Sequence, residues 1–245
     1  MQIRKQRKTT VSSSRQKDSL NPKYTLENFV VGSSNRFAYN CAKIAAETPG
    51  KKFNPLFIYS EVGLGKTHLL HAIGNHIKSS NPSSRVLYVP CEKFTNEFIE
   101  AIHFGNPALF KKKYRNLDCL LIDDIQFLAG KESSQEEFFY IFNSLYDSRK
   151  QIVVSSDRLP KKLEKIIDER LVSRFGWGVT ADIQTPDLET RIDILRKKAK
   201  DKKLFVPDDV LLYIAKNIKS NIRVLESSLL RITEFSTYAN TPLTH

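Results

Sequence analysis

The sequence contains few cysteines, and they form no recognisable pattern. Cys41, Cys91 and Cys119 are far apart, no C-x-x-C pair occurs, and no Cys/His cluster has the spacing of zinc ligands. The five histidines form no ligand set. These absences argue against a disulfide framework and a zinc site, and they indicate free thiols in a reducing compartment.

Long apolar segments and common hydrolase motifs are missing as well. No run is long enough to span a membrane, and the charged amino-terminal residues lack the apolar core of a secretory signal. We therefore predict a cytoplasmic protein. The sequence has no G-x-S-x-G or H-E-x-x-H motif, no Cys/His nucleophile arrangement and no internal repeat.

Positive charge, in contrast, is in excess. The 245 residues include 39 Lys and Arg but only 27 Asp and Glu, a net charge of +12. This balance favours an anionic partner, most often nucleic acid. Part of the excess is local, because residues 1–20 are basic and rich in Ser, Thr and Gln. We interpret them as a disordered arm or linker, and the alternative is a basic tail that only improves solubility.

The stretch at 56–73 has the order strand, loop, helix. Its apolar start, Leu56–Tyr59, predicts a buried strand, and a helical period follows the Gly-Lys-Thr at 65–67. Gly63 and Gly65 would let backbone N–H groups approach an anion. The sequence therefore predicts a phosphate loop, and the alternative is a glycine turn with a chance Lys-Thr.

Two side chains of this loop carry the predicted chemistry. Lys66 would reach the β- and γ-phosphates of a nucleotide, and the Thr67 hydroxyl would join the ligands of Mg²⁺. Ser60 departs from the pattern, because G-x-x-x-x-G-K-[ST] has glycine there. If that turn needed a positive φ, serine would cost about 1 kcal/mol.

Two acids follow a second apolar run. Residues 119–122 predict a buried strand that ends in Asp123 and Asp124, and ligands of open α/β sheets bind at that edge. The pair resembles a Walker B motif, in which Asp123 would hold Mg²⁺ and Asp124 would orient or activate water. Solvated acids at a strand end are the alternative.

Strands alternate with helices as far as Pro186, and only helices follow. This order predicts an α/β domain at 21–184 and a small helical domain at 185–240. Two pairs in the α/β domain have capping-box spacing, Ser133 with Glu136 and Ser134 with Glu137. This spacing predicts that a helix begins there. One helix after Pro160 is expected to carry Arg170 and Arg174.

Five long strings resemble the bacterial chromosomal replication initiators of the DnaA family. They are SLNPKYTLENFVVGSSNRFAYN, GLGKTHLLHAIG, YRNLDCLLIDDIQFLAGKESSQEEFFYIFN, SSDRLP and ERLVSRFGWGVTADIQTPDLETR. The resemblance runs from about residue 20 to about residue 243. It implies a P-loop AAA+ module, with a five-stranded parallel sheet, flanking helices and a small all-α lid, that binds ATP or ADP with Mg²⁺.

The resemblance also implies roles for single residues. Asp157 matches the first sensor, Arg223 the sensor arginine of the lid, and Arg174 the arginine that reaches the γ-phosphate of a neighbouring subunit. Val31 falls in the segment near adenine. Thr95, in the initiator-specific insertion at 92–114, and Lys131, in the loop LAGKESS, lie in regions that face single-stranded DNA in the family.

The implied function is a weak ATPase that acts as a switch. It would assemble head to tail on origin DNA, bind single strands and promote duplex opening, and the resemblance allows contacts with the replicative helicase, regulatory ATPases and acidic phospholipids. In the family a helix-turn-helix domain that reads duplex DNA comes next, and residues 241–245 would begin the connection to it. Because the sequence ends there, we expect a fragment or a shortened paralogue.

Other departures and alternatives stay open. Val224 and Ser227 replace residues that often follow the lid arginine, and Ser133 stands where some members have an arginine near DNA. For the arginines, the alternative is a solvated helix face. The alternative functions are a regulatory paralogue or helicase-loader-like ATPase, and a non-hydrolysing DNA-binding scaffold.

Overall fold

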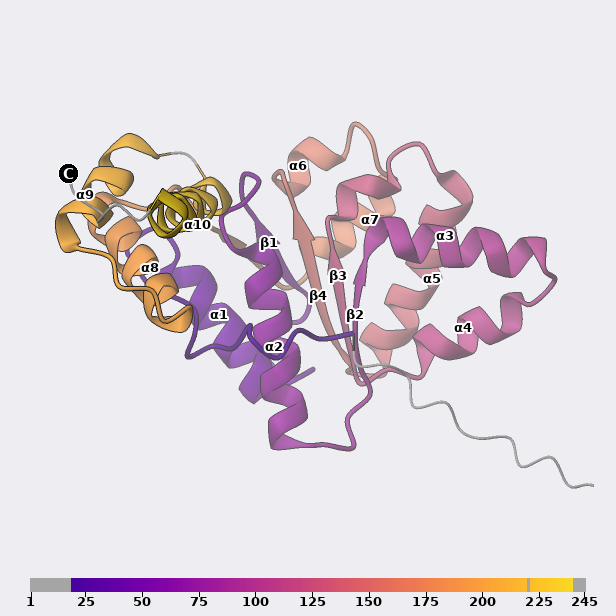
Figure 1. Cartoon of the computed structure of the whole chain (residues 1–245). Coiled ribbons are helices and arrows are strands. Elements are labelled where there is room, and N and C mark those ends of the chain that lie inside the picture. Colours follow the sequence, from indigo (N-terminus) through magenta and orange to yellow (C-terminus); the bar gives the residue numbers. More distant parts are fainter. Residues whose placement is uncertain (1–18, 220, 240–245) are drawn as a thin grey trace, which may run out of the picture.

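The centre of the molecule is a parallel sheet. In the computed structural model, residues 19–219 and 221–239 are described, and their five strands have the order β2-β3-β4-β1-β5 (Figure 1). Every pairing between neighbouring strands is parallel. This confirms the predicted five-stranded parallel sheet. The strands are β1 (Leu56–Tyr59), β2 (Val86–Pro90), β3 (Cys119–Asp123), β4 (Gln151–Ser156) and β5 (Val179–Asp182).

Helices cover both faces of the sheet, which explains its continuous apolar strands. Side chains alternate along β3, so Leu120 and Ile122 join one buried cluster while Cys119 and Leu121 join another. The first cluster includes residues of α3, α4, α5 and α7, and the second includes residues of α1 and α2. The bounds are α1 (Arg36–Glu47), α2 (Lys66–Ser80), α3 (Cys91–His103), α4 (Pro107–Arg115), the 3-10 helix η1 (Ile125–Leu128), α5 (Glu132–Asp147), α6 (Pro160–Leu163) and α7 (Glu169–Phe175).

Three further helices, α8 (Leu188–Asp201), α9 (Asp208–Asn217) and α10 (Ile222–Ala239), form a group at one end of the molecule (Figure 1). They share a third apolar cluster, which includes Leu195, Leu211 and Leu229. Lys197 Nζ donates to the backbone oxygen of Glu27 at 2.9 Å, so the group also contacts the segment before α1. The predicted domain boundaries at 184 and 240 stay predictions.

The start of α5 differs from the prediction. The helix begins at Glu132, and the backbone N–H of Ser134 donates to the carbonyl of Lys131 at 3.0 Å. Both predicted cap residues, Ser133 and Ser134, therefore already lie in the first turn. The preceding Gly130 has φ +71, a conformation that favours glycine and turns the chain into the helix earlier. Both capping boxes were wrong.

The helix expected to carry Arg170 and Arg174 is in fact the second of two. α6 ends at Leu163 and α7 begins at Glu169, because Asp168 caps α7 with a side chain that accepts from the N–H of Arg170 at 2.8 Å. A helix N-cap has a non-helical backbone, so it separates the two helices.

The predicted arm falls mostly outside the described residues, which begin at 19. Its last residue, Leu20, is buried and packs against Gly74, where a Cβ would clash with the Leu20 side chain. Leu20 therefore belongs to the folded part. Residues 241–245 are also outside the described part. Among residues 19–219 and 221–239, no helix is long and apolar enough to cross a membrane.

Candidate nucleotide site

The loop between β1 and α2 has a backbone that requires glycine at two positions. Gly63 has φ +84 and Gly65 has φ +105, where other L-residues are strained. Space is short as well. A Cβ on Gly65 would lie 3.1 Å from the ring of Phe29, and one on Gly63 would lie 2.1 Å from the Asn221 side chain. The loop can therefore present its N–H groups beside the first turn of α2, where anions are favoured.

Ser60 fits this loop without strain. Its φ is not positive, so the cost considered from the sequence does not arise. Its N–H donates to the carbonyl of Ser156 at 3.2 Å, and its hydroxyl donates to the carbonyl of Glu61 at 2.7 Å. Ser60 therefore extends the pairing of β1 with β4 by one residue.

Lys66 lies inside this loop and is only 6% exposed. Its Nζ donates to the carbonyls of Ser60 at 2.8 Å and Glu61 at 3.0 Å, and to the Ser60 hydroxyl at 3.1 Å. Burial lowers the pKa of Lys66, while the carboxylates of Asp124 and Asp123 act against that shift. The site thus holds a buried cation at the helix N-terminus, the charge that a phosphate group needs.

Asp123 ends β3 and is 3% exposed. Its Oδ2 accepts hydrogen bonds from the hydroxyls of Thr67 and Tyr88, both at 2.8 Å, and its Oδ1 accepts one from Ser155. A carboxylate beside a hydroxyl offers the hard oxygen ligands that Mg²⁺ prefers. Within the described part of the chain, no three His, Cys, Asp or Glu residues gather as a metal cage. Two ligands suit Mg²⁺, because it usually keeps several waters and binds phosphate oxygens.

Asp124 follows directly, in an unusual conformation with φ +57. Its N–H donates to Ser155 Oγ at 2.8 Å, and its Oδ1 accepts from Gln126 Nε2 at 3.1 Å. Burial raises the pKa of Asp124, and the negative charge of Asp123 raises it further. A carboxylate with a raised pKa beside a candidate phosphate site is a candidate general base.

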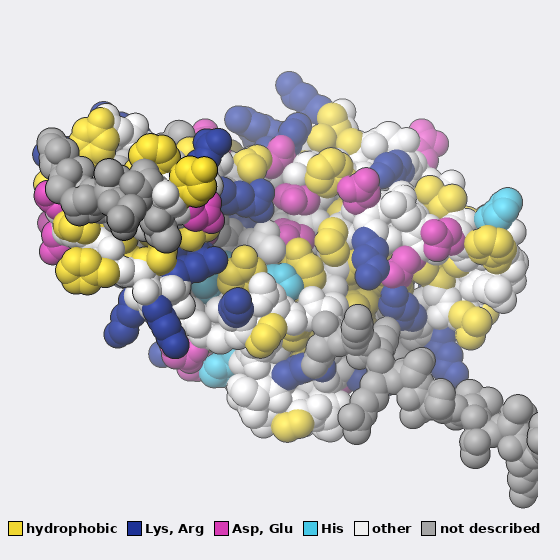
Figure 2. All heavy atoms as spheres, in the orientation of Figure 1, with side chains coloured by type: hydrophobic (Ala, Val, Ile, Leu, Met, Phe, Trp, Pro, Cys, Tyr) yellow, Lys and Arg dark blue, Asp and Glu magenta, His cyan; other side chains and the backbone are white. Residues whose placement is uncertain are grey.

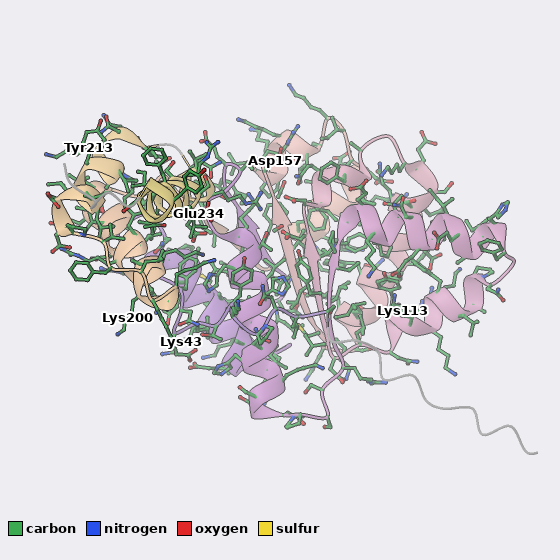
Figure 3. All side chains as sticks on the ribbon, in the orientation of Figure 1. Lys43, Lys113, Asp157, Lys200, Tyr213 and Glu234 are labelled. Carbon is green, nitrogen blue, oxygen red and sulfur yellow. The ribbon has the colours of Figure 1, made fainter. Side chains whose placement is uncertain are left out.

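Asp157 lies at the tip of β4 and is labelled in Figure 3. Its N–H donates to Gln126 Oε1 at 3.3 Å, which connects it with Asp124 through one side chain. Its carboxylate accepts two hydrogen bonds from Arg158, at 2.8 and 3.0 Å, and these lower its pKa. The structure therefore brings Asp157 next to the site with its carboxylate paired to Arg158.

The lid reaches the same place. Asn221 packs on Gly63, and its Oδ1 accepts from the N–H of Arg223 at 2.8 Å. Arg223 is exposed, yet its positive charge contributes to lowering the pKa of Lys66. Val31, which is 39% exposed, lies in the short segment between Phe29, which contacts Gly65, and Gly32, which packs on the lid helix α8. Near neighbours of Val31 and Arg223 in the sequence, Phe29 and Asn221, thus contact Gly65 and Gly63 of the loop.

Arg174 lies elsewhere, on α7. Its Nε donates to Asn143 Oδ1 at 2.9 Å, and its guanidinium carbon lies over the rings of Trp177 and Phe139. Asn143 and Phe139 lie on α5, and Trp177 lies in the turn after α7. This location, away from its own phosphate loop, is compatible with the predicted action on a neighbouring subunit.

The two predicted DNA contacts differ in accessibility. Lys131 is half-buried at the N-terminus of α5. Thr95 is only 1% exposed, and its hydroxyl donates to the carbonyl of Cys91 at 3.0 Å, one turn earlier in α3. Its side chain faces the core because α3 packs that face on η1 and β2. The placement corrects the prediction for Thr95, and only Lys131 stays a candidate.

Sequence reasoning missed two residues of the site, Tyr88 and Ser155. Both contact Asp123, but each belongs to a different strand. The signal was weak: Tyr88 is a hydroxyl-bearing residue among the apolar residues of β2, and Ser155 is one of the two serines that end β4. Which strand would lie next to β3 could not be read from that signal.

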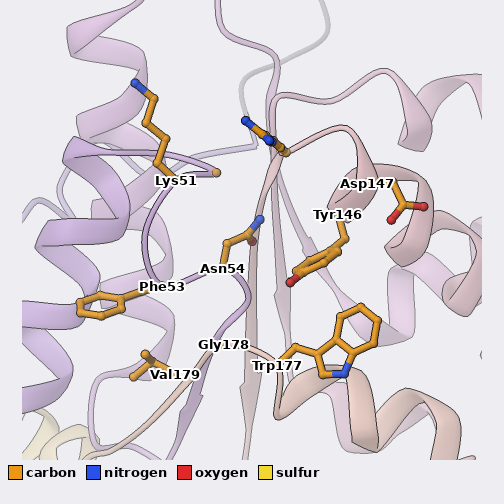
Figure 4. Close-up of a pocket in the computed structure, with 10 residues that line it drawn as sticks. Lys51, Phe53, Asn54, Tyr146, Asp147, Trp177, Gly178 and Val179 are labelled. Atoms are coloured by element: carbon orange, nitrogen blue, oxygen red, sulfur yellow. The ribbon is translucent and has the colours of Figure 1, made fainter.

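A pocket of about 700 Å³ lies at the opposite edge of the sheet (Figure 4). Its residues lie before β1, before β4 and at the start of β5, so the pocket adjoins the amino ends of these strands. Figure 4 shows Tyr146 and Trp177 on one side of it and Lys51 and Phe53 on the other. It contains none of the predicted site residues and is distinct from the nucleotide site.

Comparison with known proteins agrees with this geometry. Residues 20–182 match the family described as the bacterial DnaA ATPase domain. The fold is similar to domain III of the Thermotoga maritima replication initiation protein DnaA, with a TM-score of 0.88, 46% identity, and coverage of 92% of this chain and 93% of that one.

Two larger initiator structures are also similar. A replication initiator DnaA bound to AMPPCP and single-stranded DNA gives a TM-score of 0.80 at 40% identity, covering 92% of this chain and 76% of that one. AMPPCP-bound DnaA from Aquifex aeolicus gives 0.81 at 45% identity, covering 88% of this chain and 66% of that one. The chain therefore belongs to the family of bacterial DnaA ATPase domains.

Proposed function

We propose that the chain is the ATP-binding module of a replication initiator. One observation carries this: a buried Lys66 at the start of α2 lies beside Thr67, whose hydroxyl donates to the buried carboxylate of Asp123. Such a set binds a phosphate chain with Mg²⁺. Two similar initiators hold the ATP analogue AMPPCP, which supports ATP and ADP as ligands.

Each residue of the site has a proposed role. Lys66 and the N–H groups around Gly63 and Gly65 bind phosphates, while Thr67 and Asp123 hold Mg²⁺. When bound, Mg²⁺ neutralises charge on the phosphate oxygens.

Hydrolysis and sensing fall to other side chains. Asp124 orients the attacking water, Asp157 and Arg223 respond to the γ-phosphate, and Val31 lies beside the base. The state of a nucleotide-dependent switch is set by whether ATP or ADP is bound. Slow hydrolysis keeps the ATP-bound state long enough to act, so we propose a weak ATPase.

DNA and further copies of the chain are the proposed partners. A similar initiator is bound to single-stranded DNA, which supports single strands as a ligand, with Lys131 as one contact. Figure 2 shows Lys and Arg side chains gathered near α6 on the edge where the strands end, a surface of the sign that DNA requires. Head-to-tail assembly would use Arg174 in trans.

Several finer expectations stay predictions. They are duplex binding through a following domain, contacts with the replicative helicase, regulatory ATPases or acidic phospholipids, and a cytoplasmic location. The helicase-loader and regulatory alternatives are less favoured, since identities of 40–46% connect the chain to initiators. The assembled set of Lys66, Thr67 and Asp123 counts against a scaffold without nucleotide.

The test is an equilibrium titration of ATP and ADP in the presence of Mg²⁺, with Lys66→Ala as the variant. Loss of a cation with several charge-assisted contacts should cost about 2–3 kcal/mol of binding free energy. Lys43→Ala is the control, because Lys43 is an exposed lysine of α1 paired with Glu47. Unchanged affinity in folded Lys66→Ala would refute the phosphate-loop assignment.

A further inference from the structure

Tyr88 contacts the proposed metal ligand but has no role in the function described so far. It lies on β2, next to β3, and its hydroxyl donates to Asp123 Oδ2 at 2.8 Å. Thr67 donates to the same oxygen at 2.8 Å, while Ser155 donates to Oδ1. Two of these three donors, from β2 and β4, therefore fix the carboxylate from outside the phosphate loop.

Tyr88 is itself held from two sides. The ring of His71, on α2, lies with its centroid 3.9 Å from that of Tyr88. The backbone N–H of Tyr88 donates to Ser19 Oγ at 3.0 Å, and the N–H of Asn21 donates to His71 Nδ1 at 3.1 Å. The segment at 19–21 thus contacts both the strand and the imidazole that packs on Tyr88. A side chain so constrained can impose its own orientation on a carboxylate.

We propose that Tyr88 is a positioning residue for Mg²⁺: its hydroxyl holds Asp123 so that Oδ2 lies beside the Thr67 hydroxyl. This inference rests on the proposed nucleotide function and extends it to a residue outside the phosphate loop. Residues that orient a metal-ligating carboxylate from behind act on metal affinity, with losses of 10–100-fold when they are removed.

The experiment compares Tyr88→Phe with the parent protein in an ADP-binding titration over a range of Mg²⁺ concentrations. Phenylalanine keeps the ring beside His71 and removes only the hydroxyl. We expect the Mg²⁺ concentration at half-saturation to rise about tenfold. We expect ADP affinity in EDTA to be unchanged, since it does not depend on the orientation of Asp123 toward the metal.

Tyr114→Phe is the matched control. Tyr114 also donates to a carboxylate at 2.8 Å, but its acceptor is Glu97 Oε2 on α3, away from the nucleotide site. This variant loses an equivalent hydrogen bond and should bind Mg²⁺ and ADP as the parent does.

Two results would overturn the inference. One is an unchanged Mg²⁺ dependence in folded Tyr88→Phe. The other is an equal loss of ADP affinity with and without Mg²⁺, which would mean that the hydroxyl supports the structure in general. If the parent protein itself bound no ADP at any Mg²⁺ concentration, the proposed function would fail instead.

Discussion

Arg174 stacks on Trp177, with the guanidinium carbon 3.7 Å from the centroid of the indole ring. A hydrogen bond from Arg174 Nε to Asn143 Oδ1 at 2.9 Å fixes the same group from another direction. Stacking of a cation on Trp contributes about 0.5–1 kcal/mol at exposed sites. These two contacts hold the guanidinium in one orientation on α7, which would lower the entropy cost of the proposed contact in trans.

The first prediction concerns assembly. Arg174→Ala should leave the ATP affinity of the monomer within about twofold but abolish ATP-dependent assembly on a single-stranded oligonucleotide. The reason is that a guanidinium binds phosphate oxygens with two donors, and ADP lacks the γ-phosphate that would distinguish the two states. Sedimentation with ATP, ADP and the oligonucleotide measures this.

Arg196→Ala is the control for that experiment, because Arg196 is paired with Asp208 within the lid. It should assemble as the parent protein does. Assembly of Arg174→Ala at the level of the parent, or equal assembly with ADP and ATP, would contradict the proposal that Arg174 acts in trans.

The second prediction separates the two acids at the end of β3. Asp124→Asn should bind ATP normally and hydrolyse it about 10²-fold more slowly, because general-base roles contribute on that order. Asp123→Asn should instead weaken Mg²⁺-dependent binding of ATP, because it removes the buried carboxylate that accepts a hydrogen bond from the Thr67 hydroxyl. Nucleotide titrations and single-turnover hydrolysis distinguish them, and identical profiles for both variants would show that the roles are wrongly assigned.

The third prediction concerns DNA. Lys131→Ala should weaken binding of single-stranded DNA and reduce the slope of log K against log salt by about 0.7, the value for one phosphate contact on a single strand. The exposed lid residue Lys200, labelled in Figure 3, provides the control variant Lys200→Ala. A salt series of fluorescence-anisotropy titrations measures both. An unchanged slope in Lys131→Ala would remove this residue from the DNA contact.

The fourth prediction is a pH dependence of stability at Asp118, which precedes β3. Burial raises its pKa, but hydrogen bonds from the Arg85 backbone, Lys150 and the Arg85 side chain outweigh that effect and lower the pKa to about 2. A depressed pKa stabilises the fold above the unfolded value of about 4. That contribution should be lost as the pH falls from about 4 toward 2.

Asp118→Asn tests this by urea unfolding over the same pH range. Because the side chain is 30% exposed, the contribution should be no more than about 1 kcal/mol. The variant should be less stable than the parent at pH 6 and should differ less from it near pH 2, while the exposed Asp201→Asn should follow the parent throughout. A constant difference at all pH values would exclude the titration of Asp118 as its cause.

Local patterns in the sequence were sufficient for most elements. The apolar run Leu56–Tyr59 forms a strand, as predicted. β3 begins at Cys119, as predicted, and ends at Asp123, so Asp124 lies just outside it. The Gly-Lys-Thr join lies where a helix begins, with Gly65 in the left-handed conformation at its N-cap. These predictions succeeded because each depends on residues close together in the chain, whose periodicity and turn chemistry are visible without the rest of the fold.

Other features depended on contacts between distant segments. The serines at 133 and 134 had capping-box spacing, yet a backbone turn at Gly130 and Lys131 started the helix earlier. Thr95 lies in a segment that resembles a DNA-facing element, but the packing of α3 buried its side chain. A helical pattern shows which residues share a face, and only the neighbouring elements decide whether that face is covered.

The phosphate loop, the acids at the end of β3 and the alternation of strands and helices could all be predicted from local sequence patterns. The position of β2 next to β3 could not, and it is this strand order that lets Tyr88 reach Asp123 across 35 residues of chain. The stacking of Arg174 on Trp177 was likewise decided only by the tertiary structure. Strand order and side-chain stacking depend on how separate elements pack, because hydrogen bonds and van der Waals contacts act over a few ångströms in space, whatever the separation along the chain.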